Sequence, residues 1–345
     1  MIARVLKLAG LVVGGAFALA APAKAQDLNG AGATFPFPIY DKWFKEYAQK
    51  TGVKINYQPI GSGGGIRQFS EGTVDFGASD APMSDEQLSK LKGPAVHIPT
   101  VLGADVITWN LPEVTTPLNF TGQLIADIYM GKVTKWNSAE IASLNKGVKL
   151  PDRDIVVVHR SDGSGTTYIF TDYLTTVSPT WAAGPGRGTD VQWPVGLGGK
   201  GNDGVSGQVK QTPGAIGYVE LAYARQNKLP FGLVKNAAGV YVTPSIESIV
   251  AAAAASASKV AASPDLRVSF VNAPGKDSYP ISSWTYILLS TTQADPAKGK
   301  KVIDFLRWAI HDGQKDASAL DYGPLPAPVV AQLDKRLNLI KNVAK

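Results

Sequence analysis

Three short turns of the chain consist mainly of small and hydroxyl-bearing residues, two of them rich in glycine, and each adjoins a segment with helical character. They are Ala33-Thr34-Phe35, Gly61-Ser62-Gly63-Gly64 and Gly163-Ser164-Gly165-Thr166. At the start of a helix, such a turn exposes backbone N–H groups, adds hydroxyl donors and has the positive end of the helix dipole behind it. The turns therefore have the chemistry of anion-binding sites, although a helix cap in a flexible loop is the plainer interpretation of either of the first two taken singly.

Arg160 and Asp162 precede the third turn, at the end of an apolar strand-like segment. Because they are two residues apart, their side chains can point to the same side, where the carboxylate can hold the guanidinium for a bidentate contact with a tetrahedral oxyanion. The alternative is an exposed ion pair, worth at most ~1 kcal/mol. The spacing does not separate the two interpretations, and the position beside a Ser-Gly-Thr helix start favours a site.

The chain lacks the residues that a metal site or a reactive thiol would need. The chain has no cysteine, which excludes cysteine nucleophiles, disulfides, zinc knuckles and iron–sulfur clusters. Its three histidines are far apart in the sequence, at His97, His159 and His311. None of their spacings puts two ligands on one helical face, so we expect no metal ion and no cofactor.

Nucleotide binding and hydrolysis also lack their motifs. A nucleotide phosphate loop needs Ser or Thr after its Gly-Lys pair, but Gly199-Lys200 is followed by Gly201. Ser164 has Asp162 two residues before it, where a hydrolase nucleophile elbow needs glycine. We therefore expect no catalytic residue and no enzymatic activity.

Strand-like and helix-like segments alternate along the chain, which indicates an α/β fold. Helices are predicted at 37–50, 66–69, 167–174, 251–255 and 302–310, and strands at 53–57, 74–77 and 155–158. The glycine-rich turns fall between a strand and a helix. In open α/β sheets such turns lie at the carboxyl ends of the strands, where ligands bind.

Length and charge narrow the class of protein further. The chain has 345 residues, 44% apolar and 18% charged, which is typical of a globular protein of about two domains. The net charge is +6, but three of the cations lie in the first 25 residues. The remainder has no Lys/Arg run and no aromatic residues interleaved with basic ones, so we do not expect nucleic acid as a partner.

Residues 1–25, MIARVLKLAGLVVGGAFALAAPAKA, have the pattern of a cleaved signal peptide. The uncharged apolar run from Leu8 to Ala21 is about 14 residues, shorter than the ~20 that a membrane-spanning helix needs. No cysteine stands at the cleavage site, so we do not expect a lipoprotein. The mature chain is expected to begin at Gln26 and to be exported, to the periplasm where the source has two membranes.

Seven stretches, in the same order, closely resemble the periplasmic phosphate-binding proteins of high-affinity phosphate ABC transporters. They are GAGATFPFPIYDKW (30–43), INYQPIGSGGGIRQF (55–69), TVDFGASDAPMS (73–84), DIYMGKVTKWN (127–137), VVVHRSDGSGTTYIFTDYL (156–174), WPVGLGGKGNDGV (193–205) and PGAIGYVELAYA (213–224). The resemblance covers essentially the whole chain after residue 25.

This resemblance implies a fold, a function and partners. The fold is the two-lobed periplasmic-binding-protein fold (type II), α/β, in which each lobe is a central mixed sheet flanked by helices and a two-strand hinge joins the lobes. Such a protein closes on one dehydrated inorganic phosphate in the cleft and delivers it to the transmembrane permease subunits of the transporter. The resemblance also implies a monomer.

The ligand contacts of the family fall on residues that are all present here. They are Ala33, Thr34, Phe35, Ser62, Asp80, Arg160, Ser164, Gly165 and Thr166, and Asp162 matches the carboxylate that pairs with the binding arginine. One departure is Gly63, where a relative carries a second serine. That difference leaves open a secondary hydroxyl contact near the turn.

Asp80 is the selective residue in this set. An ionised carboxylate can only accept a hydrogen bond, so it needs a ligand with a P–OH proton, which phosphate has near neutral pH and sulfate lacks. A site of this kind can reject an analogue by ~10⁴ or more. Arsenate has the same protonation pattern as phosphate and is expected to be excluded poorly.

Several alternatives remain open at this point. Asp80 is equally compatible with a helix N-cap before Ala81-Pro82. Another oxyanion, such as sulfate or molybdate, is a second candidate ligand that Asp80 disfavours. A secreted phosphatase is a candidate from a different class, but it would lack a metal cluster or histidine base.

We expect residues 26–110 and 275–345 to form lobe one and residues 111–274 to form lobe two. The segments 101–110 and 279–289 are the expected crossings, since both are apolar and strand-like. Thr34, Ser62 and Asp80 would then lie on one lobe and Arg160 to Thr166 on the other, so that phosphate bridges them. The outer rims of both lobes are expected to dock the permease.

Overall fold

The computed structural model describes residues 27–293 and 295–340, so the segment predicted to be a signal peptide lies outside the described residues. The strands are β1 (Leu28–Gly32), β2 (Ile55–Pro59), β3 (Phe76–Ser79), β4 (Ala95–Trp109), β5 (Asn119–Phe120), β6 (Val156–Arg160), β7 (Leu197–Gly199), β8 (Ala215–Glu220), β9 (Leu233–Lys235), β10 (Tyr241–Val242) and β11 (Ser282–Ser290). The helices are α1 (Phe37–Thr51), α2 (Ser62–Glu71), α3 (Asp85–Ser89), α4 (Gly122–Tyr129), α5 (Ala139–Leu144), α6 (Gly165–Val177), α7 (Pro179–Ala183), α8 (Gly201–Gln211), α9 (Leu221–Gln226), α10 (Ile246–Ala255), α11 (Ala257–Ala262), α12 (Pro296–Ile310) and α13 (Ala327–Leu339), with short 3₁₀ turns at Asp312–Asp316 and Ser318–Leu320.

One mixed sheet runs through the whole molecule in the strand order β2-β1-β3-β11-β4-β8-β6-β7. β1 is parallel to β2 and β3, whereas β11 is antiparallel to both β3 and β4. On the far side, β4 is antiparallel to β8, and β8, β6 and β7 are parallel to one another. A smaller sheet of β10, β9 and β5 lies beside it.

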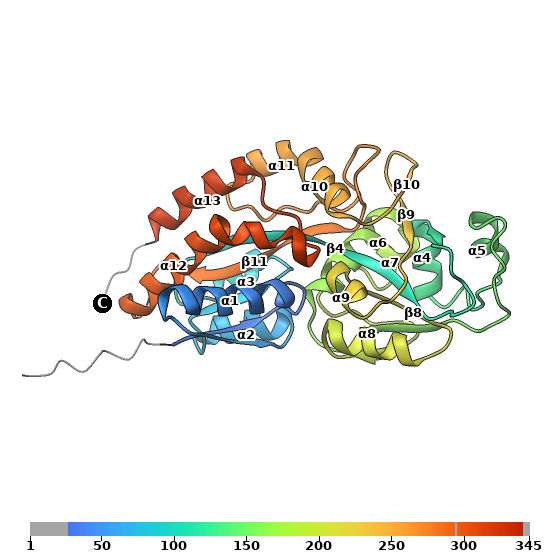
Figure 1. Cartoon of the computed structure of the whole chain (residues 1–345), viewed down its shortest axis with the longest axis horizontal. Coiled ribbons are helices and arrows are strands. Elements are labelled where there is room, and N and C mark those ends of the chain that lie inside the picture. Colours follow the sequence, from blue (N-terminus) through green and yellow to red (C-terminus); the bar gives the residue numbers. More distant parts are fainter. Residues whose placement is uncertain (1–26, 294, 341–345) are drawn as a thin grey trace, which may run out of the picture.

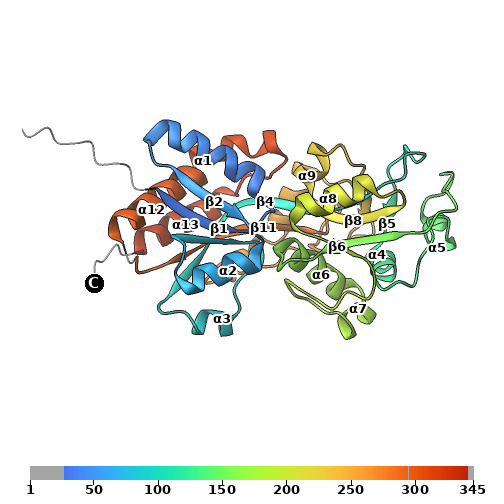
Figure 2. The ribbon, with the colours of Figure 1, turned by 90° about the horizontal axis from the view of Figure 1, so that it is seen from below.

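Two lobes are visible, each with helices on both sides of its part of the sheet (Figures 1 and 2). Figure 2 shows α1 on one side of β1 and β2 and α2 on the other, and it shows α8 and α6 on opposite sides of β6 and β8. α12, from the end of the chain, belongs to the same lobe as α1. This is the two-lobed α/β architecture that the resemblance implies.

β4 is the strand that passes from one lobe to the other. Its first part, as far as Ala104, pairs with β11, and from Asp105 onward it pairs with β8. The exchange of partners falls inside the segment 101–110 that the sequence predicts to be a crossing. β11 covers most of the second expected crossing, 279–289, but it pairs only with β3 and with the part of β4 before Asp105, so this strand itself stays on one side of the exchange.

Two buried acids face each other where β4 changes partner. Asp105 and Glu220 are cross-strand neighbours on β4 and β8, and both are fully buried. Burial raises the pKa of both carboxyls well above the usual range. Among the described residues, neither carboxyl oxygen of Asp105 has a hydrogen-bond partner, so a neutral carboxylic acid is the form that fits this position.

The predicted elements are present, with shifted ends. The helix predicted at 37–50 is α1, and it stops at Gly52, which has φ +76°. The helix predicted at 66–69 is α2, which begins earlier, at Ser62. The strand predicted at 53–57 is β2, displaced to Ile55–Pro59.

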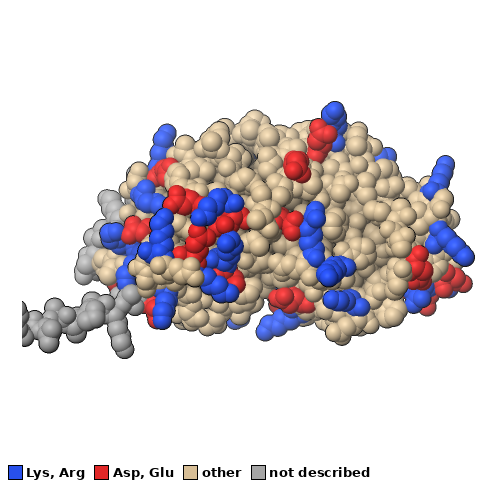
Figure 3. Space-filling view, viewed as in Figure 1, with Lys and Arg blue, Asp and Glu red and all other residues tan. Residues whose placement is uncertain are grey.

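Charged side chains of both signs intermingle on the face shown in Figure 3. Over the first lobe, Lys42 Nζ lies 3.5 Å from a carboxylate oxygen of Asp316, and Lys50 Nζ lies 2.8 Å from one of Asp312. These pairs cover the exposed side of α1 without making a patch of one sign. Among the described residues, no helix has both the length and the apolar character needed to cross a bilayer.

Candidate functional site

Four turns from distant parts of the chain meet where strands of the two lobes end. β1 and β3 are parallel neighbours, so their carboxyl ends lead Thr34 and Asp80 to the same edge of the sheet. β6 ends at Arg160 in the other lobe. The two groups touch directly, because the N–H of Gly63 donates to the carbonyl oxygen of Gly163 at 2.8 Å.

The turn after β1 keeps two of its three amides free. The N–H of Ala33 already donates to the carbonyl of Ala78 at 3.0 Å. Among the described residues, no protein acceptor takes the N–H of Thr34 or of Phe35. These two amides are therefore the donors that this turn can offer to an anion, and Ala33 contributes only backbone shape.

Three tyrosines fix the direction of those amides by binding the carbonyls of the turn. Their hydroxyls donate to the carbonyl oxygens of Ala33, Thr34 and Phe35 at 2.7, 2.6 and 2.6 Å, from Tyr57, Tyr223 and Tyr322 respectively. In a trans peptide the N–H points opposite to the preceding C=O. Tyr57, which binds the carbonyl of Ala33, therefore makes the N–H of Thr34 point away from the Tyr57 hydroxyl. Tyr223, which binds the carbonyl of Thr34, does the same for the N–H of Phe35. The sequence carried no signal for these tyrosines, which come from distant elements.

Arg160 is held in place by Asp162. Its Nε lies 2.8 Å from one carboxylate oxygen of Asp162 and its Nη2 lies 2.6 Å from the other. The Arg160 side chain is 1% exposed, so this pair is buried rather than the exposed ion pair of the alternative interpretation. Burial acts to raise the pKa of Asp162, but the hydrogen bonds from Arg160 and from the N–H of Gly201 outweigh it, and the pKa is lowered.

Asp80 lies at the centre of the site and is 2% exposed. Its Oδ1 accepts a hydrogen bond from Thr285 Oγ1 at 2.7 Å, and its Oδ2 lies 3.4 Å from Ser62 Oγ. Burial raises the pKa of Asp80 to about 7, against the opposing effects of the Thr285 hydrogen bond and the Arg160 charge. Oδ2 accepts only the longer hydrogen bond, from Ser62, and keeps an acceptor position for a ligand.

The helix-cap interpretation of Asp80 is wrong. The next helix, α3, begins at Asp85, and its N-cap is Ser84, which forms a capping box with Gln87. Thr285, which does hold Asp80, stands at the point where β11 shifts register against β4. A polar residue in the middle of the apolar run WTYILL gave no pattern from which this contact could be predicted.

The start of α6 packs directly against the first lobe. Ser164 is its N-cap and accepts from the N–H of Thr167 at 3.0 Å. A Cβ on Gly165 would lie 2.4 Å from both Asp80 Oδ2 and Ser62 Oγ, so only glycine fits here in this closed arrangement. As first-turn residues, Gly165 and Thr166 have N–H groups with no intrahelical acceptor.

The ten predicted residues therefore come together in space, and the structure adds Asn202 to them. Asn202, in the first turn of α8, lies within hydrogen-bond distance of the hydroxyls of Thr34 and Thr166. It belongs to the stretch GGKGNDG, which lacks the Ser or Thr of a nucleotide phosphate loop and lies within 193–205, one of the stretches that carry the resemblance. The resemblance therefore points to this segment of the chain, but nothing in the sequence distinguishes the asparagine within it.

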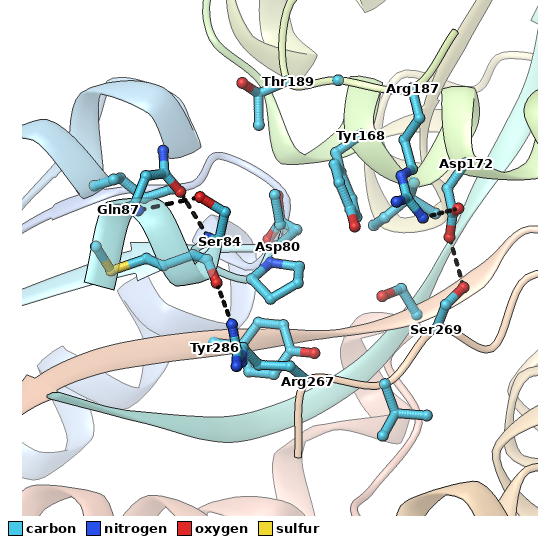
Figure 4. Close-up of a pocket in the computed structure, with 18 of the residues that line it drawn as sticks. Asp80, Ser84, Gln87, Tyr168, Asp172, Arg187, Thr189, Arg267, Ser269 and Tyr286 are labelled. Carbon is cyan, nitrogen blue, oxygen red and sulfur yellow. Dashed lines mark hydrogen bonds and ion pairs between the residues drawn. The ribbon is translucent and has the colours of Figure 1, made fainter. Parts of the chain in front are cut away.

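A pocket of about 910 Å³ opens beside Asp80 between the lobes, and Figure 4 shows its lining. Ser84 and Gln87 lie on one side, and Tyr168 and Asp172 of α6 lie on the other. Asp172 accepts from Arg187 Nη1 at 3.0 Å and from Ser269 Oγ at 2.6 Å, as the dashed lines show. Residues of both lobes thus border the opening next to Asp80.

The residues described, 27–293 and 295–340, contain no group of three His, Asp or Glu side chains that could hold a metal ion. The chemistry of the site is that of a cage of donors: amides, hydroxyls and one guanidinium surround a single ligand-facing carboxylate. Such a set fits an oxyanion that keeps one proton.

Residues 19–312 match a family model described as the PBP superfamily domain. The chain is 46% identical over 312 residues to the phosphate-binding protein PstS of Xylella fastidiosa (strain Temecula1), covering 90% of this chain and 85% of that protein. It is also 46% identical over 311 residues to PstS of Pasteurella multocida, covering 90% and 89%. With PstS of Methanocaldococcus jannaschii it shares 37% identity over 366 residues, covering 99% and 94%.

Solved structures with the same fold are more distant in sequence. The ancestral soluble variant of the human phosphate binding protein superposes with a TM-score of 0.72 at 21% identity, covering 93% of this chain and 99% of that one. A phosphate binding protein from Stenotrophomonas maltophilia superposes with a TM-score of 0.69 at 21% identity, covering 90% and 94%. At this identity the likeness establishes the two-lobed fold.

Proposed function

The chain belongs to the family of PstS phosphate-binding proteins, and from this membership we propose that it binds one inorganic phosphate between its lobes and delivers it to the permease of a membrane ABC transporter. The observation that carries the proposal is the convergence of donors from both lobes on Asp80, a buried carboxylate with one oxygen left to accept. The protein is a substrate-binding component of transport, and we propose that it has no enzymatic activity of its own.

The ligand contacts are assigned by the donor that each residue has left to give. Backbone N–H groups come from Thr34, Phe35, Ser62, Gly165 and Thr166, hydroxyls from Thr34, Ser164 and Thr166, and the guanidinium from Arg160. The Ser62 hydroxyl accepts from the N–H of Asp80 and donates to Asp80 Oδ2. Asp162 and Ala33 support these contacts without donating to the ligand. Asp162 holds the guanidinium through two hydrogen bonds, and Ala33 accepts the Tyr57 hydroxyl.

Asp80 supplies selectivity. With Thr285 on Oδ1, an ionised Asp80 presents Oδ2 to the ligand and needs a proton from it. Hydrogen phosphate has that proton. Sulfate has none near neutral pH, so its oxygen would face the carboxylate without a hydrogen bond, a loss that separates analogues by ~10⁴ or more in sites of this kind. Arsenate keeps the proton and is expected to bind.

Closure of the lobes follows from the same contacts. A ligand shifts a two-state equilibrium by its difference in affinity for the two states. Since Asp80 and Arg160 come from different lobes, phosphate gains both sets of contacts only when the lobes are closed. The closed form is then the one that the permease would recognise, through the outer rims of both lobes.

The remaining proposals concern organisation and location. Residues 26–110 and 275–345 form lobe one and 111–274 form lobe two, a division supported by the change of partner in β4 at Ala104 and Asp105. The chain is exported to the periplasm through a cleaved signal peptide at 1–25, carries no lipid and acts as a monomer.

Isothermal titration calorimetry of residues 26–345 tests the function. The protein is first unfolded and refolded to remove bound anion, and then titrated with phosphate and with sulfate at pH 8, above the pKa of about 7 of Asp80. One-to-one phosphate binding with no sulfate signal is expected. Sulfate binding of similar strength would contradict the role of Asp80, and no binding of either anion would overturn the proposed function.

A further inference from the structure

Asn202 lies fully buried at the start of α8 and touches a hydroxyl from each lobe. Its Nδ2 lies 2.9 Å from Thr34 Oγ1 and 3.1 Å from Thr166 Oγ1. Its backbone N–H also donates to Thr34 Oγ1, at 3.3 Å. It is a neighbour of the phosphate contacts rather than one of them.

The orientation of the Asn202 amide is determined by its third partner. The backbone N–H of Glu220 lies 2.9 Å from Asn202 Oδ1, and an N–H can only donate. The atom facing Glu220 must therefore be the oxygen. The NH₂ group is left to face the two threonines, so Asn202 donates to both of their hydroxyls.

Counting hydrogen bonds then determines where the threonine protons go. A hydroxyl oxygen has two acceptor positions and one proton. Thr34 Oγ1 accepts twice from Asn202, and Thr166 Oγ1 accepts once from Asn202 and once from Arg160 Nη1 at 3.1 Å. Within the part of the chain that the structure describes, neither hydroxyl donates to a protein acceptor. Each proton is free for a partner in the site.

We propose that Asn202 is a positioning residue of the phosphate site, which fills the acceptor positions of the Thr34 and Thr166 hydroxyls and so directs both protons to the bound anion. The inference rests on the proposed function, since it concerns the same site. It adds a residue that sets the donor character of two contacts without touching the ligand. The bonds from Asn202 to Thr34 join α8 to the turn after β1, so Thr34 is oriented only when the lobes are closed.

A double-mutant cycle on the full mature chain tests this inference. Phosphate affinity is measured by titration for the wild type, for Asn202→Ala, for the double variant Thr34→Val/Thr166→Val, and for the three changes combined. In the wild-type background, Asn202→Ala is expected to lower affinity about tenfold, the scale of one net hydrogen bond. In the Thr34→Val/Thr166→Val background it is expected to lower affinity less than twofold, because the hydroxyls through which it acts are gone.

Asn145→Ala is the matched control, because Asn145 is another buried asparagine of the same lobe. It binds Asn119 and the carbonyl of Ile141 and touches no residue of the site. It should lower the free energy of unfolding and leave phosphate affinity unchanged. If Asn202→Ala does not fold, Asn202→Leu replaces it in the cycle, since it keeps the approximate size of the side chain, is neutral and removes the NH₂ donor.

The outcomes separate the two proposals. Phosphate binding by the wild type with equal losses in both backgrounds would show that Asn202 acts only on packing, which overturns the inference alone. Unchanged affinity of Asn202→Ala in the wild-type background would overturn it as well. Absence of phosphate binding by the wild type would overturn the proposed function and the inference with it.

Discussion

The two carboxylate oxygens of Asp80 have different surroundings, and this difference defines its role. Oδ1 is bonded to Thr285, and Oδ2 faces Ser62 and the start of α6. Asp80→Asn keeps the size of the side chain but adds an NH₂ donor where the acceptor stood. We expect the variant to lose its discrimination against sulfate, as measured by sulfate competition with labelled phosphate at pH 8, where Asp80 of the wild type is ionised. Unchanged selectivity would place the acceptor elsewhere.

The pKa of Asp80 gives that selectivity a pH dependence. Because burial raises this pKa from its usual value to about 7, Asp80 becomes protonated as the pH falls below 7. A protonated carboxyl can donate to an oxygen of sulfate, so sulfate should compete better at pH 6 than at pH 8. The same pair of measurements on Asp80→Asn should show no such trend, and a trend of equal size in the variant would contradict this explanation.

Arg160 is the cation of the site, and its removal also leaves Asp162 without its partner. Arg160→Ala is expected to weaken phosphate binding by at least ~1.5 kcal/mol, the scale of a hydrogen bond to a charged group. Arg160→Lys, which keeps the charge but loses the planar fork, should bind with intermediate affinity in the same titration. A loss well below that value for the alanine variant would make Arg160 a structural partner of Asp162.

At the scale of residues, what could be predicted depends on distance along the chain. Thr34, Ser62 and the segment from Arg160 to Thr166 stand in short motifs whose chemistry is local, so the sequence indicates them. Thr285 and Asn202 act on Asp80 and Thr34, which lie 205 and 168 residues away. Only the folded sheet brings those pairs together, and their own surroundings in the sequence carry no sign of it.

At the scale of elements, α1 and α2 show the same contrast. α1 has apolar residues at helical spacing and a glycine stop, both of which are local signals, and its start was predicted correctly. α2 begins with Ser-Gly-Gly-Gly, which has low helix propensity, so its first turn was missed. Tertiary packing requires glycine in this turn, since a Cβ on Gly65 would lie 2.5 Å from the backbone of Gly32 and of Ala78. Packing rather than helix propensity therefore determines where α2 begins.

The start of α6 offers a test of closure. Gly165→Ala would place a methyl group against Asp80 and Ser62 of the other lobe, so the closed form should be blocked while each lobe still folds. We expect phosphate affinity to fall at least about tenfold, with little change in the melting temperature of the ligand-free protein. Gly207→Ala in α8 is the control, since a Cβ there meets nothing within 4 Å. Equal affinity of the two variants would argue against tight closure at Gly165.

β4 also supports the loop that follows Asp80. His97 Nε2 accepts from the N–H of Met83 at 2.9 Å, which requires the neutral ring. Burial, aided by the charge of Arg267, lowers the pKa of His97 from 6.5 to about 4. The fold therefore favours neutral His97. Its contribution to stability is fully present above pH 6.5 and is lost as the pH falls toward 4.

Urea unfolding at pH 7 and pH 4 measures that contribution. Between these two pH values, the wild type should lose up to about 3 kcal/mol more free energy of unfolding than His97→Gln, whose side chain does not titrate. The groups that titrate in both proteins contribute equally to their losses of unfolding free energy, so the difference between the two losses reports His97 alone. Parallel losses would show that His97 does not couple protonation to folding.

At the scale of the whole molecule, binding should change the shape of the protein. The two halves of the site lie on different lobes, so without ligand the lobes are expected to separate around β4. Small-angle scattering should show a smaller radius of gyration with phosphate than without it, and no such change with sulfate. Gly165→Ala should contract less at saturating phosphate. Identical curves with and without phosphate would indicate a site that does not open.

The strand order also determines when each half of the site can fold. β3 pairs with β11 through Ser79 and Tyr286, so the sheet that carries Asp80 lacks an inner strand until nearly the whole chain has been synthesised. β6, β7, α8 and β8 lie within residues 156–220 and can associate much earlier. Since contacts between distant segments form slowly, the half of the site with Arg160 should acquire its structure first. A chain stopped before residue 282 would contain the guanidinium half of the site and no completed sheet behind Asp80.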